Sequence, residues 1–318
     1  TQVTSIWVDR GLIALTALDL IIVGWGFNPA VDSAAVTNEP PVLIAASEIA
    51  SNGRVTVLQQ DSLPDSHMLY GIEDVRGLDF KTDWYEAYID TADGRIPWLA
   101  NGILLENAGP VITNLGVEAI VTSNPYLVDR HLSEGSMKLA AAIGDLYLLQ
   151  PVQPMPEGVM RFDILIAESD EAAAELIRGD PVRLDSQVIL TDTPAVRELD
   201  RVVSESDPNA SVSIIRRDPE HMVFEVRTAE AGVLVVNDAY YPGWSATVDG
   251  EPVDILRANI AFSGVVIEPG LHAVEMHYEP DSIRYGLAVS IMSIVLVGGV
   301  FGLSYLERLA RLGTNAER

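Results

Sequence analysis

The sequence predicts a membrane-anchored α+β protein, in which two transmembrane helices flank an extracytoplasmic α/β subdomain and an all-β sandwich of jelly-roll-like form. Three observations support this fold class: apolar blocks near both ends of the chain, mixed helix and strand patterns after the first block, and short alternating strands before the second. The predicted divisions are residues 5–27, 28–195, 196–281, 285–306 and 307–318.

The C-terminal block, residues 285–306, is the clearer of the two predicted transmembrane helices. Its 22 residues carry no charge. A helix of that length rises about 33 Å, enough to cross a hydrocarbon core of about 30 Å. Buried core helices seldom run so far without a polar face. We expect the tail, residues 307–318, to lie in the cytoplasm, because Arg308 and Arg311 follow the block.

The N-terminal block, residues 5–27, is less apolar because it contains Asp19. An acid inside a membrane costs about 3 kcal/mol on insertion scales, so Asp19 should face protein or water, or lie near the interface. A signal peptide is the rival interpretation, but little positive charge precedes the block and no small-residue cleavage site directly follows it. Since residue 1 is not Met, we expect a C-terminal portion whose partners include transmembrane helices encoded upstream.

The excess negative charge lies between the two blocks. The net charge is −26, and residues 28–283 hold 42 acidic and 15 basic side chains. We expect this stretch to be extracytoplasmic, since the few bases of the flanks favour the inside. An acidic chain is a poor match for nucleic acid. The absence of cysteine excludes disulfides, thiol nucleophiles and Cys-ligated metals.

The stretch 28–195 mixes helical and strand patterns. A helix is indicated over 170–180, with acids in its first turn and an Arg-Gly pair at its end. Strands are indicated at 54–58, 117–124, 145–151, 161–167 and 187–192. The strand–helix–strand order around the helix predicts an α/β layer.

The stretch 196–281 reads almost entirely as strands joined by turn residues. The predicted strands are 212–217, 221–228, 232–238, 244–249, 252–258, 261–268 and 271–279. Asp249-Gly250 between two alternating runs is a strong hairpin signal. Short, closely spaced strands of this kind predict a sandwich. Its last strand runs almost directly into the C-terminal block, so the sandwich should lie at the membrane surface.

The stretch 237–286 resembles the C-terminal signature of YfhO-type bacterial membrane proteins. The pieces that carry the resemblance, in the family's order, are Asp238, the YYPGW of 240–244, the VDG of 248–250, the RAN of 257–259 and the YEP of 278–280. Looser similarity extends to residues 69–79, 117–122, 145–151 and 19–29, so it covers most of the chain.

The resemblance implies a multi-pass membrane protein with a GT-C-like core. Members of the family are linked to glycosylation of cell-envelope polymers from a lipid-linked sugar, and such enzymes place their catalytic acid near the N-terminus. We therefore expect no catalytic residue here, and a region that covers the membrane core and orients an acceptor glycan. The alternative is a non-catalytic, membrane-anchored module that binds carbohydrate or protein. Further upstream spans with an acid-bearing first external loop would favour the enzyme.

Two groups of residues are candidates for glycan binding. Asp74, Arg76 and Asp79 lie around a glycine, where two carboxylates beside a guanidinium suit sugar hydroxyls, or alternatively form an internal ion pair that holds the loop. In the second group, aromatic rings can stack on sugars and planar side chains can donate hydrogen bonds, although the same rings could simply fill a corner of the sandwich. Its members are Tyr240, Tyr241, Trp244, Arg257 and Asn259.

The remaining motifs give few further expectations. Gly298 and Gly302 form a GxxxG step, which lets transmembrane helices approach closely. The five histidines show no metal-ligand spacing along the chain, and no Walker loop, nucleophile elbow or HExxH motif occurs. We therefore expect no metal and no cofactor.

Overall fold

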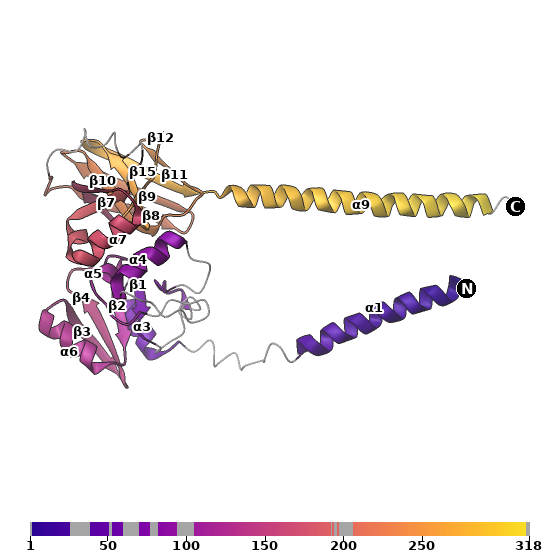
Figure 1. The fold of residues 1–318 in the computed structure, drawn as a ribbon, viewed down its shortest axis with the longest axis horizontal. Helices are drawn as coiled ribbons and strands as arrows, with labels where there is room; N and C mark the ends of the chain where they lie inside the picture. Colours follow the sequence, from indigo (N-terminus) through magenta and orange to yellow (C-terminus); the bar gives the residue numbers. More distant parts are fainter. Residues whose placement is uncertain are drawn as a thin grey trace. The chain divides into compact units, whose positions relative to one another are not determined.

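The computed structural model describes residues 2–25, 39–50, 53–59, 70–76, 82–93, 105–191, 193, 196 and 206–315. The chain divides into two compact units, Thr1–Ile44 and Ala45–Arg318. The first contains helix α1 (Gln2–Trp25), and helix α3 (Pro41–Ile49) crosses the division. The second contains all the strands that the structure describes and the long C-terminal helix α9 (Asp281–Asn315) (Figure 1).

The second unit is a mixed α+β structure with three sheets, which confirms the predicted α+β class. A four-stranded sheet has the order β1-β2-β4-β3, with β1 and β2 parallel and the other pairs antiparallel. Its strands are β1 (Arg54–Val57), β2 (Val117–Thr122), β3 (Met137–Ile143) and β4 (Leu146–Pro151), with helices α5 (Pro110–Thr113) and α6 (Pro125–Glu134) between them in sequence.

A six-stranded sheet, with the order β5-β10-β14-β13-β7-β6, draws strands from both sides of the predicted division at residue 195. Its strands are β5 (Gly158–Arg161), β6 (Asp163–Ala167), β7 (Gln187–Thr191), β10 (Gly232–Ala239), β13 (Leu256–Ala258) and β14 (Phe262–Ile267). Strands β6 and β7 run parallel and are joined through helix α7 (Asp170–Gly179) and the 3-10 helix η2 (Pro181–Asp185). This is the predicted strand–helix–strand unit, and its parallel pair departs from an all-β, jelly-roll-like sandwich.

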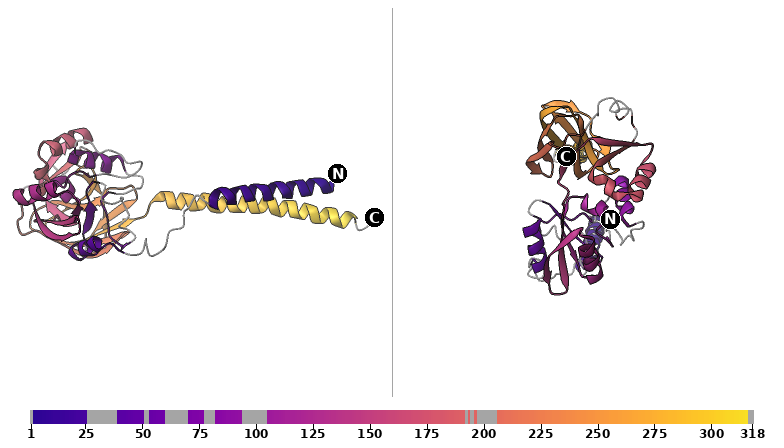
Figure 2. Two further views of the ribbon diagram at one scale, coloured as in Figure 1. Left: turned by 90° about the horizontal axis from the view of Figure 1, so that it is seen from below. Right: turned by 90° about the vertical axis from the view of Figure 1, so that its left-hand side faces the viewer.

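A five-stranded antiparallel sheet, with the order β12-β11-β15-β9-β8, faces the six-stranded one. Its strands are β8 (Ser211–Asp218), β9 (His221–Thr228), β11 (Trp244–Val248), β12 (Glu251–Val253) and β15 (Gly270–Tyr278). Figure 2 shows these strands from two further sides, with α9 continuing from the end of β15. The Asp249-Gly250 hairpin forms as predicted, with positive φ at both residues, as a type I′ turn requires.

Two predicted strands form, but each is divided into two shorter strands that pair with different partners. The stretch 161–167 breaks at Phe162, so that β5 pairs with β10 while β6 pairs with β7 at the opposite edge of the sheet. The stretch 252–258 breaks after β12, which belongs to the five-stranded sheet, and resumes as β13 in the six-stranded sheet. Around each break, neighbouring apolar side chains pack into different apolar clusters.

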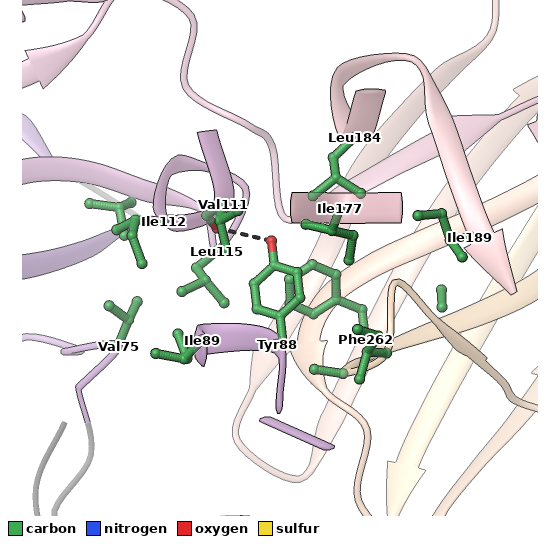
Figure 3. Packing of buried hydrophobic residues seen from close by; sticks show 14 of the residues in the cluster. Val75, Tyr88, Ile89, Val111, Ile112, Leu115, Ile177, Leu184, Ile189 and Phe262 are labelled. Carbon is green, nitrogen blue, oxygen red and sulfur yellow. Dashed lines mark hydrogen bonds between the residues drawn. The ribbon is translucent and has the colours of Figure 1, made fainter. Parts of the chain in front are cut away.

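Two apolar clusters cover the two faces of the six-stranded sheet. One lies inside the sandwich, where Leu234 and Val265 meet Phe224 and Met276 of the five-stranded sheet. The other joins the opposite face to α7 and to helix α4 (Asp83–Asp93), and it extends to the four-stranded sheet. Figure 3 shows its centre, where the ring of Tyr88 packs on Phe262 at 4.9 Å between centroids. The Tyr88 hydroxyl donates to the Val111 carbonyl oxygen at 2.9 Å.

Among the described residues, one helix is long and apolar enough to cross a membrane, over Asp281–Gly299, and none of that stretch is buried. This stretch overlaps the predicted C-terminal span, residues 285–306, over residues 285–299. The predicted N-terminal span does form a continuous helix, α1, with exposed Leu12, Ile13 and Leu15. Unlike the uncharged block of the predicted C-terminal span, α1 includes the charged residues Asp9, Arg10 and Asp19.

Candidate glycan-binding site at the aromatic corner

The segment 240–244, here called the aromatic corner, turns the chain between β10 and β11. Gly243 has φ +116°, and a Cβ at this position would lie 2.9 Å from the Pro280 Cα. The Glu279 N–H donates to the Gly243 carbonyl oxygen at 2.8 Å. Glycine is therefore required here both by the backbone conformation and by the close approach of the chain that leads into α9.

The rings of the aromatic corner face different neighbours. Trp244 packs on Tyr278 at 5.3 Å between centroids and contacts the sandwich core. Tyr241 meets the same Tyr278 edge-on at 6.1 Å and is 44% exposed. Tyr240 points to the ring of Trp84 on α4, 5.5 Å away. Trp244 thus fills a corner, whereas Tyr241 remains accessible to a ligand.

A cavity of about 610 Å³ opens beside the aromatic corner. It is lined by Thr82, Asp83, Trp84, Tyr241, Pro242, Gly243, Glu279, Pro280, Asp281 and Ser282. These residues come from α4, from the corner and from the first turn of α9. Two aromatic rings and three carboxylates contribute to the wall, and none of the described lining residues is basic.

A smaller cavity of about 250 Å³ adjoins the first, and the two share Thr82 and Tyr241. Its wall includes Arg54 and Asp238. The Arg54 guanidinium reaches from β1 to β10, where it donates to the Asn237 carbonyl oxygen at 2.7 Å and to Asp238 Oδ1 at 3.1 Å. Both contacts join the four-stranded sheet to the six-stranded sheet beside the cavities.

Arg257 lies behind Trp84 rather than in the cavity wall. Its guanidinium carbon is 5.0 Å from the centre of the Trp84 ring, and its Nη1 donates to Asp170 Oδ2 at 2.6 Å. A cation over an aromatic face is attractive. Arg257 therefore holds the Trp84 ring in place and is itself anchored by the first residue of α7.

Asn259 is buried and occupied by backbone contacts. Its Oδ1 accepts from the Ile189 N–H at 2.8 Å, and its own N–H donates to the Ile189 carbonyl oxygen at 2.7 Å. Its φ of +47° belongs to the left-handed region, which asparagine tolerates better than most residues. The side chain thus joins β7 to the turn after β13, and it does not face the cavity.

Asp74 and Arg76 form a fully buried ion pair. Both side chains have 0% exposure, and Arg76 Nη2 lies 2.7 Å from Asp74 Oδ2. Asp74 Oδ1 also accepts from the Arg76 N–H at 3.0 Å and from the Thr56 hydroxyl at 3.3 Å. This is the internal ion pair that the sequence offered as the alternative to sugar binding. The third member of that predicted group, Asp79, lies outside the described residues.

A network of ion pairs joins the same loop to the sandwich. Arg217 of β8 donates to both carboxylate oxygens of Glu73 at 2.7 Å and to Glu157 at 2.6 Å. The hydrogen bond from Arg217 holds the pKa of Glu73 below its usual value, against the opposing effect of burial. The network fixes the loop that carries Glu73 and Asp74 against the five-stranded sheet.

Sequence reasoning missed Trp84 and the carboxylates of the cavity. Trp84 and Asp83 open α4, far along the chain from the aromatic corner, so no local spacing connects them with Tyr240. Glu279 was visible only as part of the YEP of 278–280, and Asp281 only as the flank of a predicted span. An aromatic residue beside acids at the start of an amphipathic helix is the one local signal that could have marked Trp84.

Gly298 and Gly302 lie on α9 with open space around them. No atom lies within 4 Å of a Cβ built at either position. The described chain therefore supplies no helix that packs on this step.

The sandwich leads through two residues into a helix that is long and apolar enough to cross a membrane, an arrangement typical of a membrane-anchored protein. Residues 206–290 match the family model described as bacterial membrane protein YfhO, which confirms the resemblance seen in residues 237–286. The matched region contains the five-stranded sheet, the aromatic corner and the start of α9. No curated protein and no solved structure matches the chain.

Proposed function

We propose that this chain is the C-terminal extracytoplasmic region of a YfhO-like integral membrane protein that serves glycosylation of a cell-envelope polymer. In this proposal the catalytic residues lie upstream, and the cavity at the aromatic corner holds the acceptor glycan near the membrane surface.

The observation that carries the proposal is the composition and position of the cavity. Tyr241 and Trp84 offer aromatic surface for the apolar face of a sugar ring. Asp83, Glu279 and Asp281 offer carboxylates that accept hydrogen bonds from hydroxyls. Since Asp281 and Ser282 belong to the first turn of α9, a ligand bound here would lie close to the point where the chain enters the membrane.

The charges of the cavity favour a neutral sugar over a phosphate. Three carboxylates without a described basic neighbour in the wall repel an anion, and the net charge of the chain adds to this repulsion. A phosphate-linked donor sugar would therefore bind elsewhere in the parent protein. The ligand that best fits the cavity is the uncharged saccharide end of an acceptor.

Binding of neutral oligosaccharides to the full chain in lipid nanodiscs tests this proposal. With laminarihexaose as the probe, Trp84→Ala and Tyr241→Ala should each weaken binding at least tenfold, as measured by isothermal calorimetry. Tyr126→Ala is the matched control, because Tyr126 is an aromatic side chain with 75% exposure on α6.

Glucose 1-phosphate provides the second arm of this experiment. It should bind more weakly than neutral glucose if the carboxylates act as argued. Wild-type affinity in both cavity variants, with a normal melting temperature, would refute the cavity as a glycan site. Preference for the phosphorylated sugar would instead assign the cavity to the donor.

The topology that goes with this function is also a proposal. Helix α1 would form a second span, residues 28–283 would lie outside the cell and residues 307–318 in the cytoplasm. Gly298 and Gly302 would then pack against transmembrane helices encoded upstream, because small residues allow close helix approach. Protease added to intact cells should cut between the two helices, and protection of that stretch would overturn the topology.

The second candidate function is a membrane-anchored binding module without a catalytic partner. The same cavity supports it, since sugar binding needs no chemistry. The two candidates differ in the upstream sequence: many further spans and an acid in the first external loop favour the glycosylation protein. A reading frame without them favours the anchored module.

A further inference from the structure

A second cluster of functional side chains lies on the outer face of the five-stranded sheet. His221 of β9 and His277 of β15 are directly opposite each other in the ladder. Glu275 precedes His277 by two residues on the same strand and so projects from the same face. The alternate residues of these strands, including Met222 and Met276, fill the sandwich core, which places the cluster on the solvent side.

The three side chains bring their ligand atoms close together. Glu275 Oε2 lies 3.6 Å from His277 Nε2 and 3.9 Å from His221 Nε2. All three ligand atoms lie within 4.8 Å of one another. Tetrahedral zinc, with bonds of about 2.0–2.1 Å, needs ligand atoms roughly 3.4 Å apart. The cluster is therefore slightly wider than a loaded zinc site.

The imidazole rings explain the difference. They are stacked, with centroids 3.9 Å apart and an angle of 22° between their planes. The lone pair of each Nε2 lies in the plane of its ring, and two stacked, nearly parallel planes share no point close to both nitrogens. Rotation of both rings about their Cβ–Cγ bonds would point the lone pairs at one ion beside Glu275.

The protein leaves this cluster incompletely satisfied. The Nε2 atom of His221 is buried and has no hydrogen-bond partner. Glu275 Oε2 is too far from either ring nitrogen for a hydrogen bond. Arg216 on the neighbouring strand β8 pairs with Asp218. A divalent cation would satisfy His221, His277 and Glu275 together.

We propose that His221, Glu275 and His277 form a zinc-binding site on the outer face of the sandwich. Two imidazoles and one carboxylate are zinc ligands, whereas calcium and magnesium prefer oxygen alone. Three protein ligands leave a fourth position for water or another ligand. The site would fasten β9 to β15 next to Tyr278, the residue on which Trp244 and Tyr241 pack.

The spacing of the ligands explains why sequence analysis expected no metal. Two ligands come from β15 and the third from β9, more than fifty residues earlier, and only strand pairing brings them together. The proposal is independent of the glycan site, because its residues do not line the cavity at the aromatic corner.

Zinc titration of the full chain tests the proposal. The protein should be purified in detergent without a polyhistidine tag, stripped with EDTA and titrated with zinc chloride by calorimetry. We expect one equivalent to bind. His221→Phe and His277→Phe preserve an aromatic stack but remove a ligand, and each should weaken zinc binding at least tenfold.

His272→Phe is the matched control. His272 lies on the same strand as His277 but contacts Asp249, with 2.8 Å between Nδ1 and Oδ2, and it takes no part in the cluster. This variant should bind zinc like the wild type. Cobalt substitution should give visible absorption bands that vanish in His221→Phe and His277→Phe.

Three results would overturn the zinc proposal. The first is the lack of saturable binding by the wild type. The second is unchanged affinity in folded His221→Phe or His277→Phe. The third is an equal loss of affinity in His272→Phe, which would indicate adsorption to the acidic surface. Melting temperatures in EDTA identify variants that fail to fold, and Glu275→Gln then serves as the further ligand variant.

Discussion

The loop that carries Asp74 and Arg76 has a residue pattern similar to that of the aromatic corner. The two regions differ in the exposure of their side chains to solvent. Both combine polar or aromatic residues with a glycine, and both were candidates for glycan binding with a structural role as the alternative. In the loop, the guanidinium and carboxylate are completely buried against each other. At the corner, Tyr241 is 44% exposed beside a cavity. Residue type thus suggests what a side chain can bind, but burial decides whether a ligand can reach it.

The largest effect in this comparison should come from Arg76→Ala. Removing one partner leaves the Asp74 carboxylate buried without its cation, which typically costs about 3–5 kcal/mol of unfolding free energy. We expect the melting temperature of the full chain in detergent to fall sharply.

The double variant Asp74→Leu/Arg76→Met is the matched control for the loop. It replaces both charges with apolar side chains, so it should recover most of the stability lost in Arg76→Ala. If Arg76→Ala changed the melting temperature only slightly but reduced glycan binding, the structural role of the ion pair would be contradicted. The loop would then be a ligand-binding site.

Trp244→Ala and Trp84→Ala should separate packing from binding at the corner itself. Trp244 contacts the sandwich core, so its truncation should cost stability, on the order of 2–3 kcal/mol for a large, partly buried ring. Trp84→Ala should reduce glycan binding by a larger factor than Trp244→Ala does among molecules that remain folded. Thermal melts and calorimetry on the same samples measure both quantities.

Gly243→Ala should destabilise the corner by roughly 1–3 kcal/mol, the usual cost of a strained backbone conformation. The added methyl group would meet the backbone of Pro280, which cannot move aside like a flexible side chain. Gly135→Ala is a useful control: Gly135 also has positive φ, but nothing lies within 4 Å of its Cβ position. A smaller loss in Gly135→Ala than in Gly243→Ala would attribute the difference to the Pro280 contact.

The smallest effect should come from Glu73, which is about half exposed. Glu73→Gln removes a partner of Arg217 and should cost no more than about 1 kcal/mol, since solvent and salt screen such pairs. Because the pKa of Glu73 is lowered in the folded state, its contribution is present above its ordinary value of 4.5 and is lost as the pH falls through the folded value.

The comparison of wild type and Glu73→Gln over pH tests that sign. The difference in their melting temperatures should be constant near neutral pH and should shrink in acid below 4.5. A difference that grows in acid would mean that the pKa of Glu73 is not lowered by Arg217.

Local sequence patterns predicted most strands of the five-stranded sheet, because hairpins with residues such as Asp249-Gly250 are determined by their own turns. They could not place β5, β6 and β7 in the same sheet as β14, since that pairing depends on contacts across long sequence separations. The pattern also missed the break at Phe162, whose ring packs with the sandwich core while Ile164 packs with the other cluster.

The candidate site was predicted only in part, because some of its residues are neighbours in sequence and others come together only in the fold. The corner residues are adjacent in sequence, so the motif was visible. Trp84 reaches the corner only through the packing of α4 on the six-stranded sheet. The carboxylates of the cavity come together only because residues 82–84, 241–243 and 279–282 pack side by side. No single stretch of sequence shows that these three segments share one cavity.

The order in which strands join the six-stranded sheet has a consequence for biosynthesis. Strand β5 pairs with β10, and β7 pairs with β13, so strands made early wait for partners made much later. Their unpaired edges stay open while the intervening residues emerge, and open edges invite wrong pairing with other chains. The nascent protein should therefore need shielding until β14, which ends at Ile267, has left the ribosome and paired with β10 and β13.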